Sequence, residues 1–208
     1  MEIITKATKD YTWAQLKEAA ENGTISDLLH SGDLIPFTLK NGEIVAVRVA
    51  HAKGKMFFVL EDCLNEEHVM NDTATTAGGW ADTEMRRYLN EEVFALLPDD
   101  LQAVIAPTKI VQIVDGERVE TEDRLFLFSM TQVFGIGPWT QREPEDVQLD
   151  CFIREKDRVK ECGDSGTWFW WLRSAISATT FYSVYTSGNY SNNIANVSYG
   201  VALGFCLI

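Results

Sequence analysis

The residues best suited to chemistry lie in one uncharged stretch near the C-terminus. Residues 174–208 contain no Asp, Glu, Lys, Arg or His, although 24% of the chain is charged. The part from Ser174 to Tyr199 is polar all the same, because Tyr, Ser, Asn and Thr dominate it. Tyr offers a rigid contact area with a polar tip, and Ser and Asn exchange hydrogen bonds without net charge. The composition favours non-covalent recognition of a partner. The alternative is an ordinary exposed β-hairpin, since Tyr and Thr also favour strands.

Within this stretch, we expect four tyrosines to carry most of the binding energy, because aromatic anchors usually do. They are Tyr182, Tyr185, Tyr190 and Tyr199. An uncharged surface of this kind suits protein epitopes and glycans alike. The full set of expected ligand-contacting residues is Ile176, Ser177, Thr179, Thr180, Tyr182, Ser183, Tyr185, Tyr190, Asn192, Asn193, Ile194, Asn196, Ser198 and Tyr199.

Motifs for catalysis or metal binding are weak. The run GDSG at 163–166 resembles the nucleophile loop of trypsin-like proteases, but Thr167 follows it where those proteases have Gly. A triad also needs Ser, His and a carboxylate in contact, and nothing in the sequence supports one. The run EPE at 143–145 resembles a lectin calcium motif without its amide, whereas calcium needs several converging oxygens. We therefore expect surface loops, no catalytic residue, no metal and no cofactor.

The four cysteines are Cys63, Cys151, Cys162 and Cys206, and they show no CxxC spacing. They are expected to be reduced thiols, with a disulfide between Cys151 and Cys162 as the alternative. Cys206 lies in an apolar run and is expected to fill the core.

Charge and hydropathy exclude several classes of function. The net charge of −13 repels phosphate backbones and argues against binding to nucleic acid or to anionic lipid. No apolar run approaches the roughly 20 residues of a membrane-spanning helix. Residues Met1 to Lys9 alternate apolar and charged side chains and lack the apolar stretch of a secretory signal. Synthesis in the cytoplasm without a signal peptide is therefore expected.

The elements that must position the uncharged stretch follow from periodicity and turn signals. A helix is expected from Thr12, paired with Gln15 in a capping box, to about Asn22. A second helix is expected over 84–97. Asn41-Gly42 marks a hairpin, and Asp115-Gly116 marks another turn. The expected strands cover residues 34–40, 43–51, 56–60, 109–114, 124–129 and 201–208.

Two apolar flanks are expected to carry the fold around the uncharged stretch. They are the aromatic block Trp168 to Leu172 and the closing strand Val201 to Ile208. Residues 136–166 are polar and irregular and are expected to form a long surface insertion. Inside the stretch, the expected inward anchors are Phe181, Val184 and Ala195, and the expected turn residues are Gly188 and Gly200.

An ordered set of motifs carries a family resemblance from residue 32 onward. WWLRS at 170–174 is followed by NIAN at 193–196 and GVALGFC at 200–206. Before them stand GDLIPF at 32–37, MRRYLN at 85–90 and DRLFLFS at 123–129. This set resembles a bacterial and phage domain family related to C-type-lectin-fold proteins, some of which are variable proteins of diversity-generating retroelements. The chain departs from the family where Ala202-Leu203-Gly204 replaces the common Arg-Pro-Ala.

The resemblance implies an α+β, C-type lectin-like fold. A single domain over 1–208 would have two main helices packed on twisted antiparallel sheets. It also implies that 174–199 is a hypervariable ligand-binding segment, because adenine miscopying rewrites such codons; Ile176 to Tyr199 uses only residues that this process permits. Display on a phage virion or a cell surface would follow. The alternatives are an invariant binding module of the same fold and an oxidase of the formylglycine-generating kind.

Overall fold

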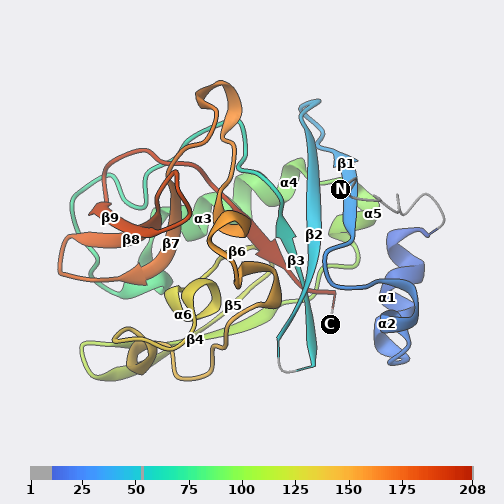
Figure 1. Cartoon of the computed structure of the whole chain (residues 1–208), viewed down its shortest axis with the longest axis horizontal. Coiled ribbons are helices and arrows are strands. Elements are labelled where there is room, and N and C mark those ends of the chain that lie inside the picture. The colour runs from blue at the N-terminus through green and yellow to red at the C-terminus, as the bar shows by residue number, and fades with distance from the viewer. Residues whose placement is uncertain (1–10, 53, 208) are drawn as a thin grey trace.

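The computed structural model describes residues 11–52 and 54–207 and shows a mixed α+β chain with antiparallel sheets. The expectations for Met1 to Lys9, and that for Ile208, lie outside the described residues. The main sheet has the order β1-β2-β3-β10-β6 (Figure 1). Its strands are β1 (Leu34–Thr38), β2 (Ile44–Ala52), β3 (Lys55–Leu60), β10 (Leu203–Phe205) and β6 (Phe126–Leu127).

Two smaller sheets stand beside the main one. The first pairs β4 (Thr108–Val114) with β5 (Glu117–Asp123), and the second has the order β7-β8-β9. The second sheet consists of β7 (Trp170–Ala175), β8 (Thr180–Val184) and β9 (Tyr190–Ile194). In Figure 1 it lies at the left end of the long axis, with α1 and α2 at the opposite end.

Most of the helices are short. α1 (Trp13–Glu21) begins at the expected capping box of Thr12 and Gln15, which confirms that prediction. The expected helix over 84–97 is also confirmed, as α3 (Glu84–Tyr88), the π-helical turn η2 (Leu89–Val93) and α4 (Phe94–Leu96) in succession. The remaining short helices are α2 (Ile25–Leu28), η1 (Gly79–Asp82), α5 (Asp99–Gln102) and α6 (Met130–Phe134). No helix among the described residues is both long and apolar enough to cross a bilayer.

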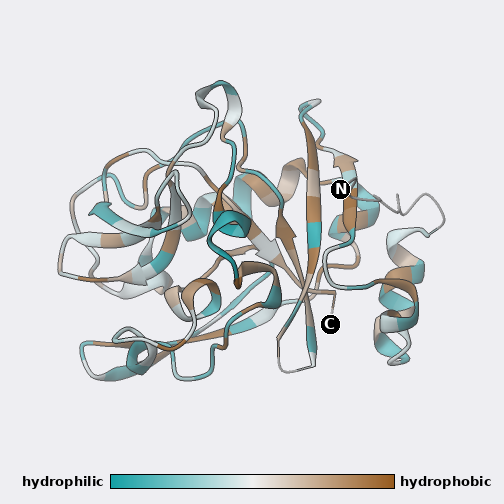
Figure 2. Ribbon diagram, in the orientation of Figure 1, coloured by the Kyte–Doolittle hydropathy of each residue, from teal (hydrophilic) through white to brown (hydrophobic). Residues whose placement is uncertain are grey.

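The closing strand lies in the middle of the main sheet, between β3 and β6. Phe205 stacks on Phe58 with ring centroids 5.2 Å apart. Gly204 has no side chain because a Cβ there would lie 2.1 Å from the ring of Phe128. The apolar segment from Val201 to Leu207 is therefore part of the core, and Figure 2 shows mainly hydrophobic residues along the neighbouring strand β3.

The strand that follows the Asp115-Gly116 turn is not among those expected. β4 pairs with β5 across the Asp115-Gly116 turn, and not with residues 124–129. The sequence does not show β5 as a strand, because most of its residues are polar. Its side chains nevertheless alternate between exposed and partly buried positions along most of its length. Phe126 and Leu127 instead join β10 as β6.

The stretch 136–166 is irregular, as expected, but it is not a surface insertion. It contains the 3-10 turns η3 (Thr140–Arg142), η4 (Asp150–Phe152), η5 (Glu155–Arg158) and η6 (Gly163–Ser165). Leu149, Phe152, Lys160 and Cys162 are buried within it. Its apolar residues are too widely spaced to show a helix or strand period, although they complete the core.

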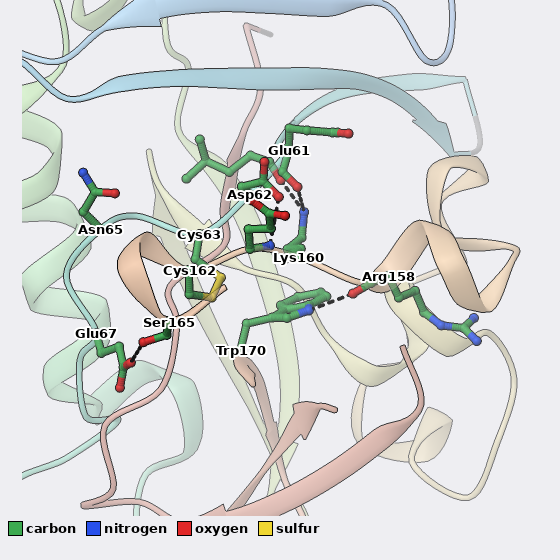
Figure 3. Close-up of a disulfide and its surroundings, with 12 residues drawn as sticks. Glu61, Asp62, Cys63, Asn65, Glu67, Arg158, Lys160, Cys162, Ser165 and Trp170 are labelled. Atoms are coloured by element: carbon green, nitrogen blue, oxygen red, sulfur yellow. Dashed lines mark hydrogen bonds between the residues drawn. A yellow bond between two sulfur atoms is a disulfide. The ribbon is translucent and has the colours of Figure 1, made fainter. Parts of the chain in front are cut away.

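The prediction of four reduced cysteines is wrong, because Cys63 and Cys162 form a disulfide (Figure 3). Their Cα atoms lie 4.7 Å apart. Cys151 and Cys206 are free and buried. The pairing joins the segment after β3 to the segment before β7, a contact between residues 99 positions apart in the sequence. Cysteine spacing alone contains no signal for such a distant partner.

Candidate ligand-binding surface

The β8–β9 hairpin holds the central part of the uncharged stretch. Tyr182 pairs with Asn192 and Thr180 with Ile194. Because side chains alternate along a strand, these residues and Tyr190 share one face of the sheet. Tyr190 is 53% exposed and Ile194 is 43% exposed. We call this set the β8–β9 face; its members are Thr180, Tyr182, Tyr190, Asn192 and Ile194.

Aromatic side chains from outside the hairpin support this face at one edge. The Trp139 ring packs edge-on against Tyr182 and Tyr190, with centroids 6.0 and 5.8 Å away. Phe134 packs against Tyr190 in the same way at 5.8 Å. Partial burial raises the pKa of the Tyr182 hydroxyl, so that group stays protonated and neutral at physiological pH. The face therefore presents uncharged aromatic and amide groups on a fixed base.

The other side of the hairpin is buried, which corrects two expected contact residues. Ser183 is fully buried opposite Trp171. Tyr199 is also buried, because its ring stacks on Phe169 and lies against Trp171, both with centroids 4.7 Å away. Neither side chain can face a partner.

The expected inward anchors are confirmed. Phe181, Val184 and Ala195 have no exposed surface. The carbonyl oxygen of Ala195 also accepts hydrogen bonds from the amides of Met70 and Asn71. These contacts hold the hairpin backbone without involving the side chains of the β8–β9 face.

The two expected turn glycines differ in role. Gly188 has φ +87° in the β8–β9 turn, and a Cβ there would lie 2.0 Å from the carbonyl oxygen of Glu155. The turn is therefore packed against η5. Gly200 is not a turn residue. Its missing Cβ makes room for the disulfide, since that atom would lie 2.5 Å or less from the sulfurs of Cys63 and Cys162.

The remaining expected contact residues occupy three places. Ile176, Ser177 and Thr179 are exposed in the β7–β8 connection. Asn196 and Ser198 are exposed after β9. Asn193 is partly buried on the inner side of β9, and Tyr185 packs on Phe169 at 4.9 Å, away from the β8–β9 face. The structure thus brings five of the fourteen predicted residues together on the β8–β9 face, and distributes the rest over its edges and its inner side.

A cleft lies next to the β7–β8 connection, and sequence reasoning missed it. Its volume is about 540 Å³. It is lined by residues from four segments, 75–79, 112–116, 139–143 and 174–178. The side chains that matter for recognition are Trp139, Arg142 and Asp115. Trp139 is the one residue of the cleft to which the sequence could have pointed. It is a large aromatic residue between glycines and a polar run, and no helical or strand periodicity assigns it to the core.

Glu143 forms the base of this cleft and has a structural role. It is buried and accepts hydrogen bonds from the amide and hydroxyl of Thr131 and from the hydroxyl of Ser174. Burial raises its pKa. Glu145 instead pairs with Arg118 at the surface, so the two carboxylates of the EPE run do not converge on a common ion.

Residues 53–207 match the model of a family described as a domain of unknown function, DUF6273. The chain belongs to the DUF6273 family. The matched region includes β7–β9, the cleft and the disulfide, and excludes α1, α2, β1 and β2. No curated protein and no solved structure matches the chain.

The two free thiols of this DUF6273 chain lie in surroundings that disfavour reaction. Burial raises the thiol pKa of Cys151 to about 12 and that of Cys206 to about 11, which disfavours the reactive thiolate. Ser165 is exposed and donates a hydrogen bond of 3.3 Å to Glu67 (Figure 3). Over residues 11–52 and 54–207, no three His, Cys, Asp or Glu side chains gather where they could hold a metal ion.

Proposed function

We propose that this DUF6273 chain is a ligand-binding protein whose β8–β9 face and adjoining loops form a hypervariable surface. In this proposal it is the variable protein of a diversity-generating retroelement. The observation that carries the proposal is the alternation along the hairpin. Tyr190, Asn192 and Ile194 face solvent, whereas Phe181 and Ser183, on the opposite face of the same hairpin, are fully buried.

This division separates stability from recognition. Burying a large apolar side chain stabilises a fold by about 1.5–3 kcal/mol, so the anchors and the tryptophans of β7 can fix the backbone. Substituting an exposed residue usually changes stability by about 0.5 kcal/mol or less. Positions on the face can therefore change without loss of the fold.

A C-type lectin-like scaffold is part of the proposal. The antiparallel sheets and a last strand placed inside the main sheet are compatible with it. The motif order from GDLIPF to GVALGFC supports it independently.

The genomic test examines the DNA around the gene. We expect adenine-rich codons across 176–199, a near-copy of that segment nearby and an adjacent reverse transcriptase gene. Sibling genes identical across this segment, with no such template, would instead favour the alternative of an invariant binding module.

The binding test is a displayed library of the full chain. Thr180, Tyr182, Tyr190, Asn192 and Ile194 are randomised with the permitted residues, and the pool is selected on unrelated protein and glycan targets. We expect most members to fold and different members to bind different targets. A matched library at Phe181, Ser183, Val184 and Ala195 should lose the fold. If the first library loses folding as often as the second, the proposal is wrong.

A further inference from the structure

Trp139 connects the cleft with the β8–β9 face. Its ring lines the cleft and also packs against Tyr182 and Tyr190. Ala175, Ser177 and Ala178 continue the cleft wall into the β7–β8 connection. A ligand on the face therefore has a hollow beside it that is built mostly from residues outside 174–199.

The indole of Trp139 is held in a fixed position. Its Nε1–H donates a 2.9 Å hydrogen bond to the carbonyl oxygen of Gly135. A Cβ on Gly137 would lie 2.5 Å from Cζ2 of the ring, so the ring rests directly on backbone at that glycine. Phe134 also packs edge-on against the ring. The cleft thus has a rigid aromatic wall, and fixed walls reduce the entropy cost of binding.

The ionisable groups that line the cleft are Arg142, Asp115 and Glu143, and the carboxylate of Glu143 already accepts hydrogen bonds from Thr131 and Ser174. Arg142 is exposed, and its Nη1 donates a 2.7 Å hydrogen bond to the carbonyl oxygen of Ala175. Asp115 is held at the tip of the β4–β5 turn with φ +51°. Within the described part of the chain, neither side chain forms an ion pair, although most other arginines do.

We propose that the cleft binds a neutral saccharide ring, with one apolar face on Trp139 and its hydroxyls at Arg142 and Asp115. This inference rests on the proposed function. It names the ligand class for the part of the binding surface that lies mostly outside the hypervariable segment. A hydroxyl both donates and accepts, so it can use a guanidinium and a carboxylate in the same site. The volume is within the range of small-molecule sites, about 300–1,000 Å³.

Charge argues against the other small ligands. An anion would meet Asp115 in the same cleft and a chain of net charge −13. A cation would meet the unpaired guanidinium of Arg142. A purely apolar ligand would leave both charged groups without partners, and desolvating them is costly. A polar ligand without net charge avoids all three penalties, and the indole of Trp139 in the lining favours a ring with an apolar face among such ligands.

The experiment is an NMR titration of the full chain with five neutral disaccharides: cellobiose, chitobiose, maltose, lactose and mannobiose. The indole N–H signal of Trp139 is assigned by its loss in Trp139→Phe. We expect at least one disaccharide to shift this signal and to saturate with a Kd of roughly 1–10 mM. The proposal is overturned if none of the five shifts it.

Two variants test the walls separately. Arg142→Gln removes the charged donor at an exposed position, and Gly137→Ala displaces the ring without changing its chemistry. Each should weaken disaccharide binding at least fivefold, whereas Ile44→Ala, at an exposed position of β2 outside the cleft, should leave it within twofold. Unchanged binding in both cleft variants would overturn the proposal. The library selection reads the face alone, so its outcome and that of this titration can fail separately.

Discussion

Nδ2 of Asn193 donates a 2.7 Å hydrogen bond to the hydroxyl oxygen of Tyr199. The bond joins the inner side of β9 to the chain that leaves it. The Tyr199 ring is meanwhile enclosed by Phe169 and Trp171. Asn193 and Tyr199, which the sequence composition predicts as ligand contacts, are therefore hydrogen-bonded to each other. They support the β8–β9 face from its inner side.

Truncation of Tyr199 should destabilise the fold. Tyr199→Ala is expected to lower the free energy of unfolding by about 3–5 kcal/mol, as for other buried aromatic residues. Tyr199→Phe should cost only about 1 kcal/mol, the value of one hydrogen bond. Urea denaturation measures both. The matched control is Tyr190→Ala, with an expected cost of about 1 kcal/mol, since Tyr190 is half exposed. Equal losses in the two alanine variants would contradict this assignment.

Substitution of Gly188 should disturb the β8–β9 turn. Alanine is strained at φ +87°, and its Cβ would clash with the carbonyl oxygen of Glu155. We expect Gly188→Ala to cost about 1–3 kcal/mol and to lower the melting temperature. Ser187→Ala, at the exposed neighbouring position, should change stability by about 0.5 kcal/mol or less. A Gly188→Ala variant that melts like the wild type would show that the turn does not rest on η5.

Reduction of the Cys63–Cys162 disulfide should weaken the fold. Closing a loop of this length restricts the unfolded chain by about 4–5 kcal/mol. We expect a lower urea midpoint with reductant, and no effect of reductant in the Cys63→Ala, Cys162→Ala double variant. Alkylation of the unfolded, unreduced chain followed by mass spectrometry should label Cys151 and Cys206 only. Labelling of Cys63 or Cys162 there would exclude the pairing.

Stability should depend on pH through Lys160. Burial lowers its pKa to about 8, whereas an unfolded lysine titrates near 10.4. The unfolded chain therefore binds this proton more tightly, and the contribution of Lys160 to the unfolding free energy rises as pH rises from about 8 to 10.4. The buried thiols oppose this trend at high pH, because their pKa values are raised.

The Lys160→Met variant isolates this effect. The difference in unfolding free energy between wild type and variant should move in favour of the wild type across that interval, as followed by urea denaturation at several pH values. A difference that stays flat from pH 7 to 10.4 would mean that the amine titrates normally. Lys160 Nζ donates to the carbonyl oxygens of Leu60 and Glu61, so a constant offset from lost hydrogen bonds is also expected (Figure 3).

Much of the local structure follows from sequence rules. The Thr12 capping box, the hairpin around Asn41-Gly42 and the buried face of Met85, Leu89 and Val93 are all present. Each depends on neighbours within a few positions, where periodicity and turn chemistry act. Phe181 was predictable for the same reason, because it alternates with Tyr182; Val184 lies on the same face as Tyr182 and is buried all the same, which strand alternation does not predict.

The errors concern contacts between residues distant in sequence. The partner of Cys63 and the burial of Leu149, Phe152 and Lys160 depend on how remote segments meet. Tyr199 shows the same limit, since only the positions of Phe169 and Trp171 make its ring a core residue. The cleft was missed because its walls come from four separate parts of the chain.

The close contact between Gly188 and the backbone of Glu155 has a consequence for how related chains can vary. A loop whose apex touches another backbone has no room for inserted residues, and the hydrogen bond from Arg158 to the Gly188 carbonyl further fixes its span. Antibody loops diversify by length as well as by composition. Here, related chains should keep the same number of residues between β8 and β9. Their binding specificities should differ through the side chains alone, on a backbone of constant shape.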